Sequence, residues 1–101
     1  MVKVNWTIHS LENIANIADF ISKDSLKYAE LFVKRIFERV KILENFPKSG
    51  RIVPEINNEN IRELIFGNYR IVYKLYETHI DIITVHHGAR LLSNSSLFDN
   101  N

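Results

Sequence analysis

Hydrophobic and polar residues alternate at the start of the chain and then recur at helical spacing. Between residues 2 and 8 the apolar side chains stand two positions apart, which is typical of a half-buried strand. Within residues 11–21 and 29–43 they instead recur every three or four positions, which is typical of the buried stripe of a helix. The first half of the chain is therefore predicted to be one strand followed by two amphipathic helices.

Polar residues and a proline mark the expected ends of these helices. Ser10 and Ser25 directly precede the two periodic runs, and serine is a preferred N-cap residue. Pro47 cannot continue a helix, so the second helix should end near Asn45. Because only a short break near residues 22–24 separates the helices, we expect an antiparallel helical hairpin.

The second half of the chain is predicted to be a loop followed by three strands. Residues 46–59 contain both prolines, a glycine and paired asparagines, which favours a long ordered loop. Residues 61–66, 69–77 and 79–87 have strand composition, and Gly67-Asn68 is a typical two-residue hairpin turn. These three strands should form an antiparallel sheet.

The order strand, helix, helix, strand, strand, strand predicts an α+β fold, with the helical hairpin packed on one face of a mainly antiparallel sheet. Residues 1–92 should form a single domain. Residues 93–101 are mostly polar and are expected to be a flexible C-terminal tail. The sheet face away from the helices should be open to solvent or to a partner.

The register of the last two strands depends on the turn between them. A two-residue turn at Thr78-His79 would place Arg70 opposite His87 on the open, solvated face. The helix-covered face would then hold Tyr69, Ile71, Tyr73, Leu75, Ile80 and Ile82. The open face would hold Arg70, Val72, Lys74, Tyr76, Asp81, Ile83, Val85 and His87.

Composition narrows the class of protein. The chain has 101 residues, is 46% hydrophobic and has no cysteine, which fits one packed domain and excludes a disulfide scaffold or a thiolate metal site. No apolar run approaches the roughly 20 residues of a membrane span, and no signal peptide is evident, so we expect a cytoplasmic protein. A net charge of +1 gives little long-range attraction for nucleic acid, and we expect no direct sequence-specific DNA binding.

Several residues of the second half could cut RNA through its 2'-hydroxyl. Glu55 or His87 would be the base, and the other of the two, or His86, the acid. The cations that stabilise charge on the phosphate would be Arg51, Arg62 and Arg70. Adjacent strand residues point to opposite faces, so the two histidines should not share a metal ion. We expect no metal and no cofactor.

The same residues also have structural interpretations. Arg70 could form a salt bridge with Glu63 or Asp81 within the sheet. Arg51 could bind the last carbonyls of the second helix, because cations are favourable at helix C-termini. Arg90 could contact a partner or serve only solubility.

Five spaced motifs resemble a known family. FPKSGR, PE, REL, GNYRIVYK and TVHHGAR follow a helical hairpin in an order similar to that of the RelE/ParE superfamily of toxins from bacterial type II toxin–antitoxin systems. The resemblance extends to about Leu92 and implies the strand and helix order predicted above. It also implies a cognate antitoxin that binds and neutralises the protein.

This superfamily has two kinds of activity. ParE-like members inhibit DNA gyrase, whereas RelE-like members cut mRNA in the ribosome. The low net charge favours the ParE-like activity, because RNA binding relies on many phosphate contacts. Target or phosphate binding would then fall to Arg51, Arg62, Arg70 and Arg90. The alternatives are a ribosome-dependent mRNA endonuclease with Arg70, His87 and Glu55 as catalytic residues, and a degenerate member kept as a partner of its antitoxin.

Overall fold

The structure is a computed structural model that describes residues 1–92, so the tail predicted at residues 93–101 lies outside the described residues. Five strands form one sheet in the order β1-β5-β4-β3-β2. Strand β1 pairs with β5 in parallel, and every other pairing is antiparallel. The elements in chain order are β1 (Lys3–Trp6), α1 (Ile8–Ser22), α2 (Leu26–Lys41), the 3-10 turn η1 (Ile42–Glu44), β2 (Arg51–Ile52), β3 (Ile61–Phe66), β4 (Tyr69–Leu75) and β5 (His79–His87). The predicted α+β fold is confirmed.

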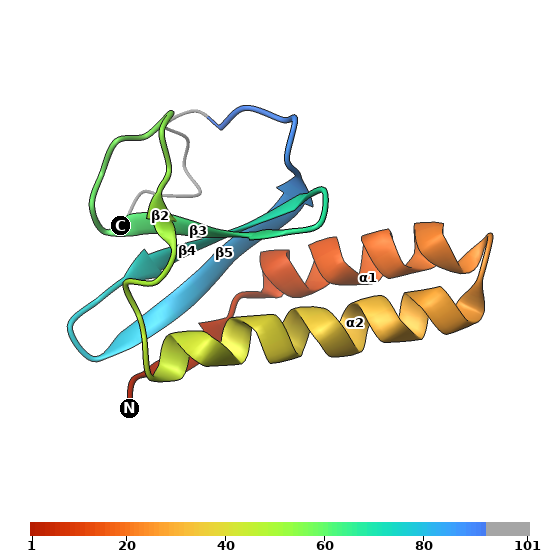
Figure 1. The fold of residues 1–101 in the computed structure, drawn as a ribbon, viewed down its shortest axis with the longest axis horizontal. Helices are drawn as coiled ribbons and strands as arrows, with labels where there is room; N and C mark the ends of the chain where they lie inside the picture. Colours follow the sequence, from red (N-terminus) through yellow and green to blue (C-terminus); the bar gives the residue numbers. More distant parts are fainter. Residues whose placement is uncertain (93–101) are drawn as a thin grey trace.

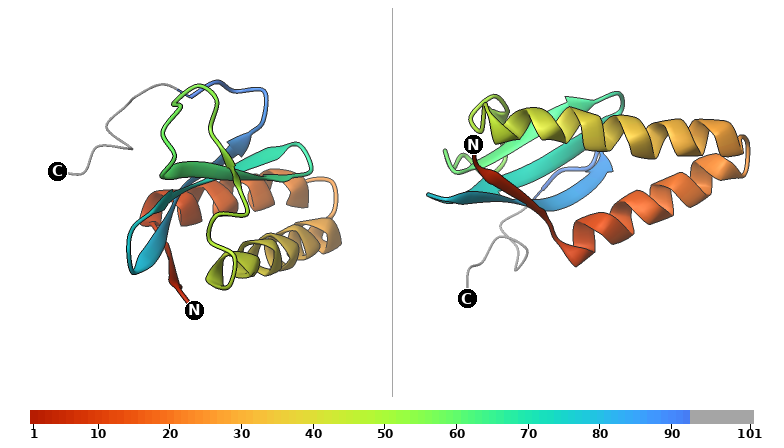
Figure 2. Two further views of the ribbon diagram at one scale, coloured as in Figure 1. Left: turned by 60° about the vertical axis from the view of Figure 1, so that its left-hand side comes forward. Right: turned by 90° about the horizontal axis from the view of Figure 1, so that it is seen from below.

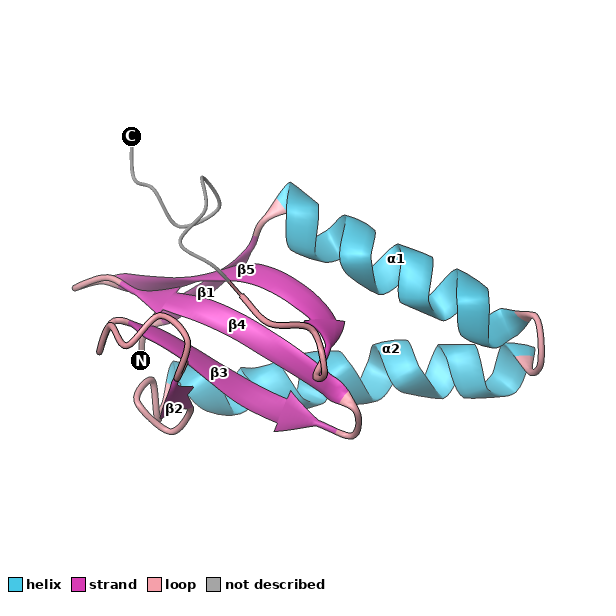
Figure 3. Cartoon of the chain, turned by 90° about the horizontal axis from the view of Figure 1, so that it is seen from above, coloured by secondary structure: helices cyan, strands magenta, loops and turns pink. Residues whose placement is uncertain are grey.

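Both helices lie on one face of the sheet and form an antiparallel hairpin (Figures 1 and 3). Figure 2 shows that the connected ends of the two helices project beyond the sheet. The core between helices and sheet is built from the apolar stripes of α1 and α2 and the helix-facing side chains of β3, β4 and β5. Its fully enclosed members include Ile36, Val40, Leu43, Ile71, Tyr73, Ile80, Ile82 and Val85. No helix within residues 1–92 is long and apolar enough to span a membrane.

Helix α1 begins one turn earlier than the sequence predicts. Its N-cap is Thr7, whose hydroxyl accepts a hydrogen bond from the Ser10 amide at 3.1 Å and donates to the Ile82 carbonyl at 2.7 Å. Ser10 is instead inside the helix and buried. Thr7 can therefore begin the helix because its hydroxyl also has a partner on β5. The predicted cap at Ser25 is confirmed by its bond from the Tyr28 amide.

The turn between β4 and β5 lies one residue earlier than predicted, which displaces the pairing of the two strands by two residues. The Tyr76 amide donates to the His79 carbonyl at 2.9 Å, so Glu77 and Thr78 form the turn. A displacement of two residues leaves each side chain on its predicted face, because the period of a strand is two. The predicted core positions in the first part of β5 are therefore correct.

A bulge in β5 then changes the register by one residue. Tyr73 pairs with Ile82 but Val72 pairs with Thr84, so Ile83 has no partner in the ladder. A single extra residue moves all later side chains of a strand to the opposite face. Val85, which was predicted on the open face, therefore lies in the core against the helices.

The bulge also overturns the predicted neighbour of Arg70. Arg70 pairs with His86, and His87 pairs with Tyr69. His87 contacts the Tyr69 ring, with the centroids 6.0 Å apart, and Tyr69 packs on Phe32 of α2. The prediction that Arg70 and His87 are cross-strand neighbours on the uncovered face is thus wrong, and His86 takes that place.

The sheet face opposite the helices is not open along its length. Val53, Ile61, Val72 and Ile83 form a second buried cluster there, against which Ile56 and Leu92 pack. The loop of residues 53–60 and the chain after β5 thus cover part of this face (Figure 1). Strand β2, which was predicted as loop, precedes this covering segment and pairs with β3.

Asn13 of α1 stabilises the bulge. Its side-chain oxygen accepts hydrogen bonds from the Val85 amide and the Thr84 hydroxyl, both at 3.0 Å. A bulge removes backbone groups from the regular ladder, and a buried amide without a partner is costly. The side chain of Asn13 therefore supplies the acceptor that the bulged strand requires.

We predict that Asn13→Ala lowers the free energy of unfolding by about 1–3 kcal/mol, because it leaves the Val85 amide without its acceptor. Asn16→Ala is the matched control, since Asn16 is exposed on the same helix, and it should change stability by less than about 0.5 kcal/mol. Urea unfolding of both variants measures the difference. Equal stability of the two would show that Asn13 does not support the bulge.

Candidate functional site

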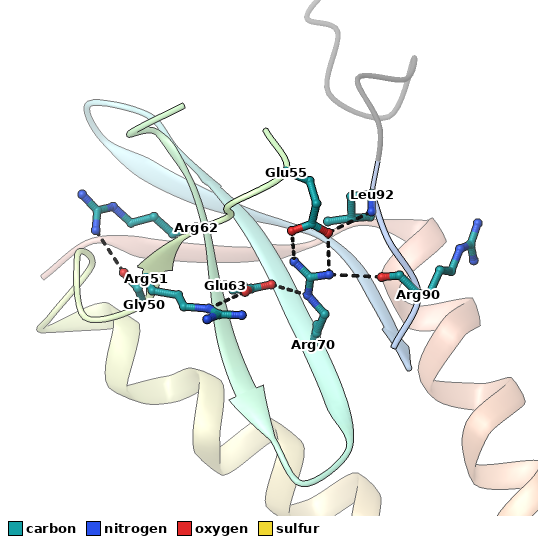
Figure 4. Close-up of polar contacts among 8 residues, drawn as sticks. All are labelled: Gly50, Arg51, Glu55, Arg62, Glu63, Arg70, Arg90 and Leu92. Carbon is teal, nitrogen blue, oxygen red and sulfur yellow. Dashed lines mark hydrogen bonds and ion pairs between the residues drawn. The ribbon is translucent and has the colours of Figure 1, made fainter. Parts of the chain in front are cut away.

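Arg70 is the centre of a charged network on the sheet face opposite the helices (Figure 4). It stands in β4 and is only 4% exposed. Its Nε donates to Glu63 Oε1 at 2.5 Å, and its two Nη atoms donate to the Glu55 carboxylate at 2.6 and 2.8 Å. The first of these Nη atoms also donates to the Arg90 carbonyl at 3.1 Å. The guanidinium is thus held on two carboxylates, one of which it binds in bidentate fashion.

Glu63 connects Arg70 to a second arginine. Its side chain is fully buried in β3, and its other oxygen accepts from Arg51 Nε at 2.6 Å. Arg51 and Glu63 are cross-strand partners, so the pairing of β2 with β3 brings them together. The salt bridge between Arg70 and Glu63, one of the structural interpretations, is confirmed. Arg51, whose structural interpretation was contact with the last carbonyls of the second helix, binds the Glu63 carboxylate instead.

Glu55 is positioned by the loop that covers this face. The Val53 amide bonds the Ile61 carbonyl at 3.1 Å, and the Asn57 amide bonds the Val53 carbonyl at 2.8 Å. Asn57 has a φ of 54°, in the left-handed region, which asparagine tolerates better than most residues. The resulting tight loop points the Glu55 carboxylate at Arg70, where it also accepts from the Leu92 amide at 3.0 Å.

The charges of this pair depend strongly on each other. The hydrogen bonds from Arg70 lower the pKa of Glu55 from 4.5 to about 2, and the Glu55 carboxylate raises the pKa of Arg70 further above its ordinary value. Since the pKa of Glu55 is lower in the folded state than in the unfolded state, its stabilising contribution is complete above about pH 4.5. That contribution is lost as the pH falls towards 2.

His86 lies beside Arg70 and is buried, at 7% exposure. Its Nε2 has no hydrogen-bond partner among residues 1–92. Burial, and then the positive charges of Arg70 and Arg90, lower the pKa of His86. Burial and these charges therefore favour the neutral form of the imidazole.

His87 lies at the exposed end of β5. Its Nδ1 accepts from the Ala89 amide at 3.3 Å, as expected for a polar residue at a strand end. Together with Arg51 and Arg70, His87 lines a cavity of about 230 Å³. The structure thus brings three of the predicted site residues to one cavity, although it separates the His87 ring from the open face.

The two remaining predicted arginines contact backbone. The side chain of Arg62 donates to the Gly50 and Glu59 carbonyls, both at 3.0 Å, and so connects the two ends of the loop. Arg90 accepts a bond from Arg70 through its carbonyl, and the residue itself is exposed. In the site, Arg62 therefore fixes the loop, whereas the Arg90 side chain is accessible to a partner.

The hydrogen bonds that Glu55 and Arg70 already make limit what this arrangement can do chemically. A general base needs a free lone pair and a pKa near the working pH, but Glu55 accepts three hydrogen bonds and has a pKa of about 2. Arg70 would have to leave two carboxylates before it could bind a phosphate. The network is therefore built to hold the loop and the chain after β5 on the sheet.

We predict that Arg70→Ala lowers the free energy of unfolding by about 3–5 kcal/mol, because it removes the buried partner of Glu63, which then keeps only the exposed Arg51, and it also removes the partner of Glu55. This replaces the expectation of an exposed arginine on a solvated face. Arg90→Ala is the control and should cost less than about 0.5 kcal/mol, since only the Arg90 backbone contacts Arg70. If Arg70→Ala unfolds in urea at the same midpoint as the parent protein, the network is not structural.

Three comparisons with known proteins agree with one another. The sequence model of a family described as "ParE toxin of type II toxin-antitoxin system, parDE" matches residues 4–92. A relative from Sinorhizobium fredii (strain NBRC 101917 / NGR234), named "Putative toxin Y4kP", is 31% identical over 88 residues, which cover 85% of this chain and 88% of the relative. A solved structure titled "Chromosomal ParDE TA system from P. aeruginosa" has the same fold, with a TM-score of 0.72, 20% identity, and coverage of 86% of this chain and 96% of that chain.

Proposed function

Because the chain belongs to the ParE toxin family of type II toxin–antitoxin systems, we propose that it inhibits growth by binding a protein target, DNA gyrase, and that a cognate antitoxin neutralises it. The predicted resemblance to this superfamily is confirmed by the family match. A protein that acts on gyrase works where the chromosome is, so the proposal also places the chain in the cytoplasm.

The engagement of Arg70 by two carboxylates is the observation that carries the choice of a protein target. Of the three residues that the endonuclease alternative needs, Arg70 and Glu55 are bound to each other. His87 lines the same cavity as Arg70, but its ring lies against Tyr69 and not beside the guanidinium. An endonuclease would need a base, an acid and a phosphate clamp that are accessible together. Binding and inhibition of a protein require only a stable surface, which this network supports.

The test combines purified protein, purified gyrase and supercoiled plasmid, and the gyrase is then denatured. We expect linear plasmid to accumulate, because a trapped gyrase leaves its double-strand break unsealed. An equimolar amount of the antitoxin should suppress the linear product. A parallel reaction with programmed ribosomes should leave the mRNA at full length.

Three outcomes contradict the proposal. Cleavage of ribosome-bound mRNA, with abolition of that cleavage in Glu55→Gln, would establish the endonuclease instead. Absence of both products, although the protein still binds the antitoxin, would identify a degenerate member that serves only as an antitoxin partner. Gyrase trapping that the antitoxin does not suppress would contradict the proposed neutralisation.

A further inference from the structure

A small cavity lies between the β3–β4 hairpin turn and the residues that follow β5. Its volume is about 230 Å³, and its lining includes Arg51, Ile65, Arg70, His87 and Gly88. Gly88 allows the two chain segments to approach closely, because its amide donates to the Asn68 carbonyl at 2.6 Å and a Cβ there would lie 3.1 Å from that oxygen. The hydrogen bond between Gly88 and Asn68 thus holds the two backbone segments on either side of the cavity together.

The free donors of one arginine in the lining favour an anion. Among residues 1–92 the cavity is lined by two arginines, one histidine and no carboxylate, and both arginines already bind carboxylates behind it, Arg70 those of Glu55 and Glu63 and Arg51 that of Glu63. The Arg51 side chain is 59% exposed, and within the described part of the chain only its Nε donates a hydrogen bond, to Glu63. Its two Nη atoms are therefore available to an acceptor from outside, in the planar geometry that suits a carboxylate.

The size and composition of the cavity favour a single side chain over a nucleic acid strand. Its volume is below the range of about 300–1,000 Å³ that is usual for small-molecule sites. Binding of a nucleic acid without base readout needs many phosphate contacts, but of the two arginines that line the cavity Arg70 is bound to two carboxylates and Arg51 alone is exposed. Ile65 is 48% exposed at the same cavity and offers an apolar contact that a phosphate backbone does not use.

We propose that this cavity receives a glutamate or aspartate side chain of the protein partner, with the Arg51 guanidinium as the charged anchor and Ile65 as the apolar contact beside it. The proposal rests on the proposed function only in that the partner is a protein. Arginine and exposed apolar residues are typical of the energetically important centre of such interfaces.

The test uses short blocked peptides as probes and the backbone amide resonances of the whole protein as the readout. A peptide with one glutamate flanked by leucines should shift the amides of Gly67, Asn68, Gly88 and Ala89, which surround the cavity. The same peptide with glutamine should bind about tenfold more weakly, because it lacks the charge-assisted hydrogen bonds. A short RNA oligonucleotide should compete poorly with the acidic peptide.

A matched pair of substitutions at Ile65 separates the effect of charge in the cavity from the effect of side-chain size. Ile65→Glu places a carboxylate in the cavity and should weaken binding of the acidic peptide at least about tenfold relative to Ile65→Gln, which has nearly the same size. Arg51→Gln should weaken binding similarly, and Arg35→Gln, on the exposed surface of α2, should leave it unchanged. Because Ile65 is half exposed, both Ile65 variants are expected to fold, and their amide spectra show whether they do.

The proposal is overturned if the acidic and neutral peptides bind equally, if the shifts fall away from the cavity, or if RNA displaces the peptide. It is also overturned if Arg51→Gln and Ile65→Glu trap gyrase as well as Arg35→Gln does and bind the antitoxin with unchanged affinity. Failure of the parent protein to trap gyrase would instead contradict the proposed function. The peptide measurements do not depend on that result.

Discussion

A guanidinium stays charged in a folded protein, so the burial of Arg70 in β4 requires negatively charged partners beside it. Glu63 in the neighbouring strand supplies one carboxylate, and Glu55 in the loop of residues 53–60 supplies the other. The second contact fixes the loop, and the same carboxylate then holds the Leu92 amide. One buried cation thus determines where two segments without regular secondary structure lie on the sheet.

The buried pair and the apolar cluster beside it support each other. Val53 and Leu92 pack on the same face of the sheet, where the Arg70–Glu63 pair is buried, so the loop is held by both kinds of contact. Exclusion of water strengthens the attraction between the charges, but it makes the loss of either partner more costly. This coupling explains how a long polar loop is ordered without a helix or a long strand of its own.

Local patterns in the sequence predicted most of the elements. The two helices, the cap at Ser25 and the turn at Gly67-Asn68 follow from spacing and residue type, because each depends on neighbours in the chain. The bulge at Ile83 could not be predicted in this way, because it depends on the Asn13 side chain, 70 positions earlier, which accepts a hydrogen bond from the strand. The start of α1 at Thr7 likewise depends on a carbonyl of β5.

The site, too, was predicted only in part, because some of its contacts join residues that are distant in the sequence. Arg70 and Glu55 were both singled out from residue type, and the structure places them together. Their bidentate pairing depends on the loop fold and was not evident from the sequence. The replacement of His87 by His86 beside Arg70 follows from the two-residue change of pairing at the turn together with the one-residue bulge. The residue types of the site were thus easier to predict than the pairing register of its strands, because each irregularity in a strand changes the pairing of all residues after it.

The titration of the Glu55 carboxylate tests this account most directly. The ¹³C resonance of its carboxyl group, followed by NMR in the intact protein, reports whether Arg70 holds it in solution. The account predicts an apparent pKa of about 2, with no change between pH 7 and pH 4. A midpoint near 4.5 would show that Glu55 is free of Arg70 and available for other chemistry, and it would contradict the structural role of the network.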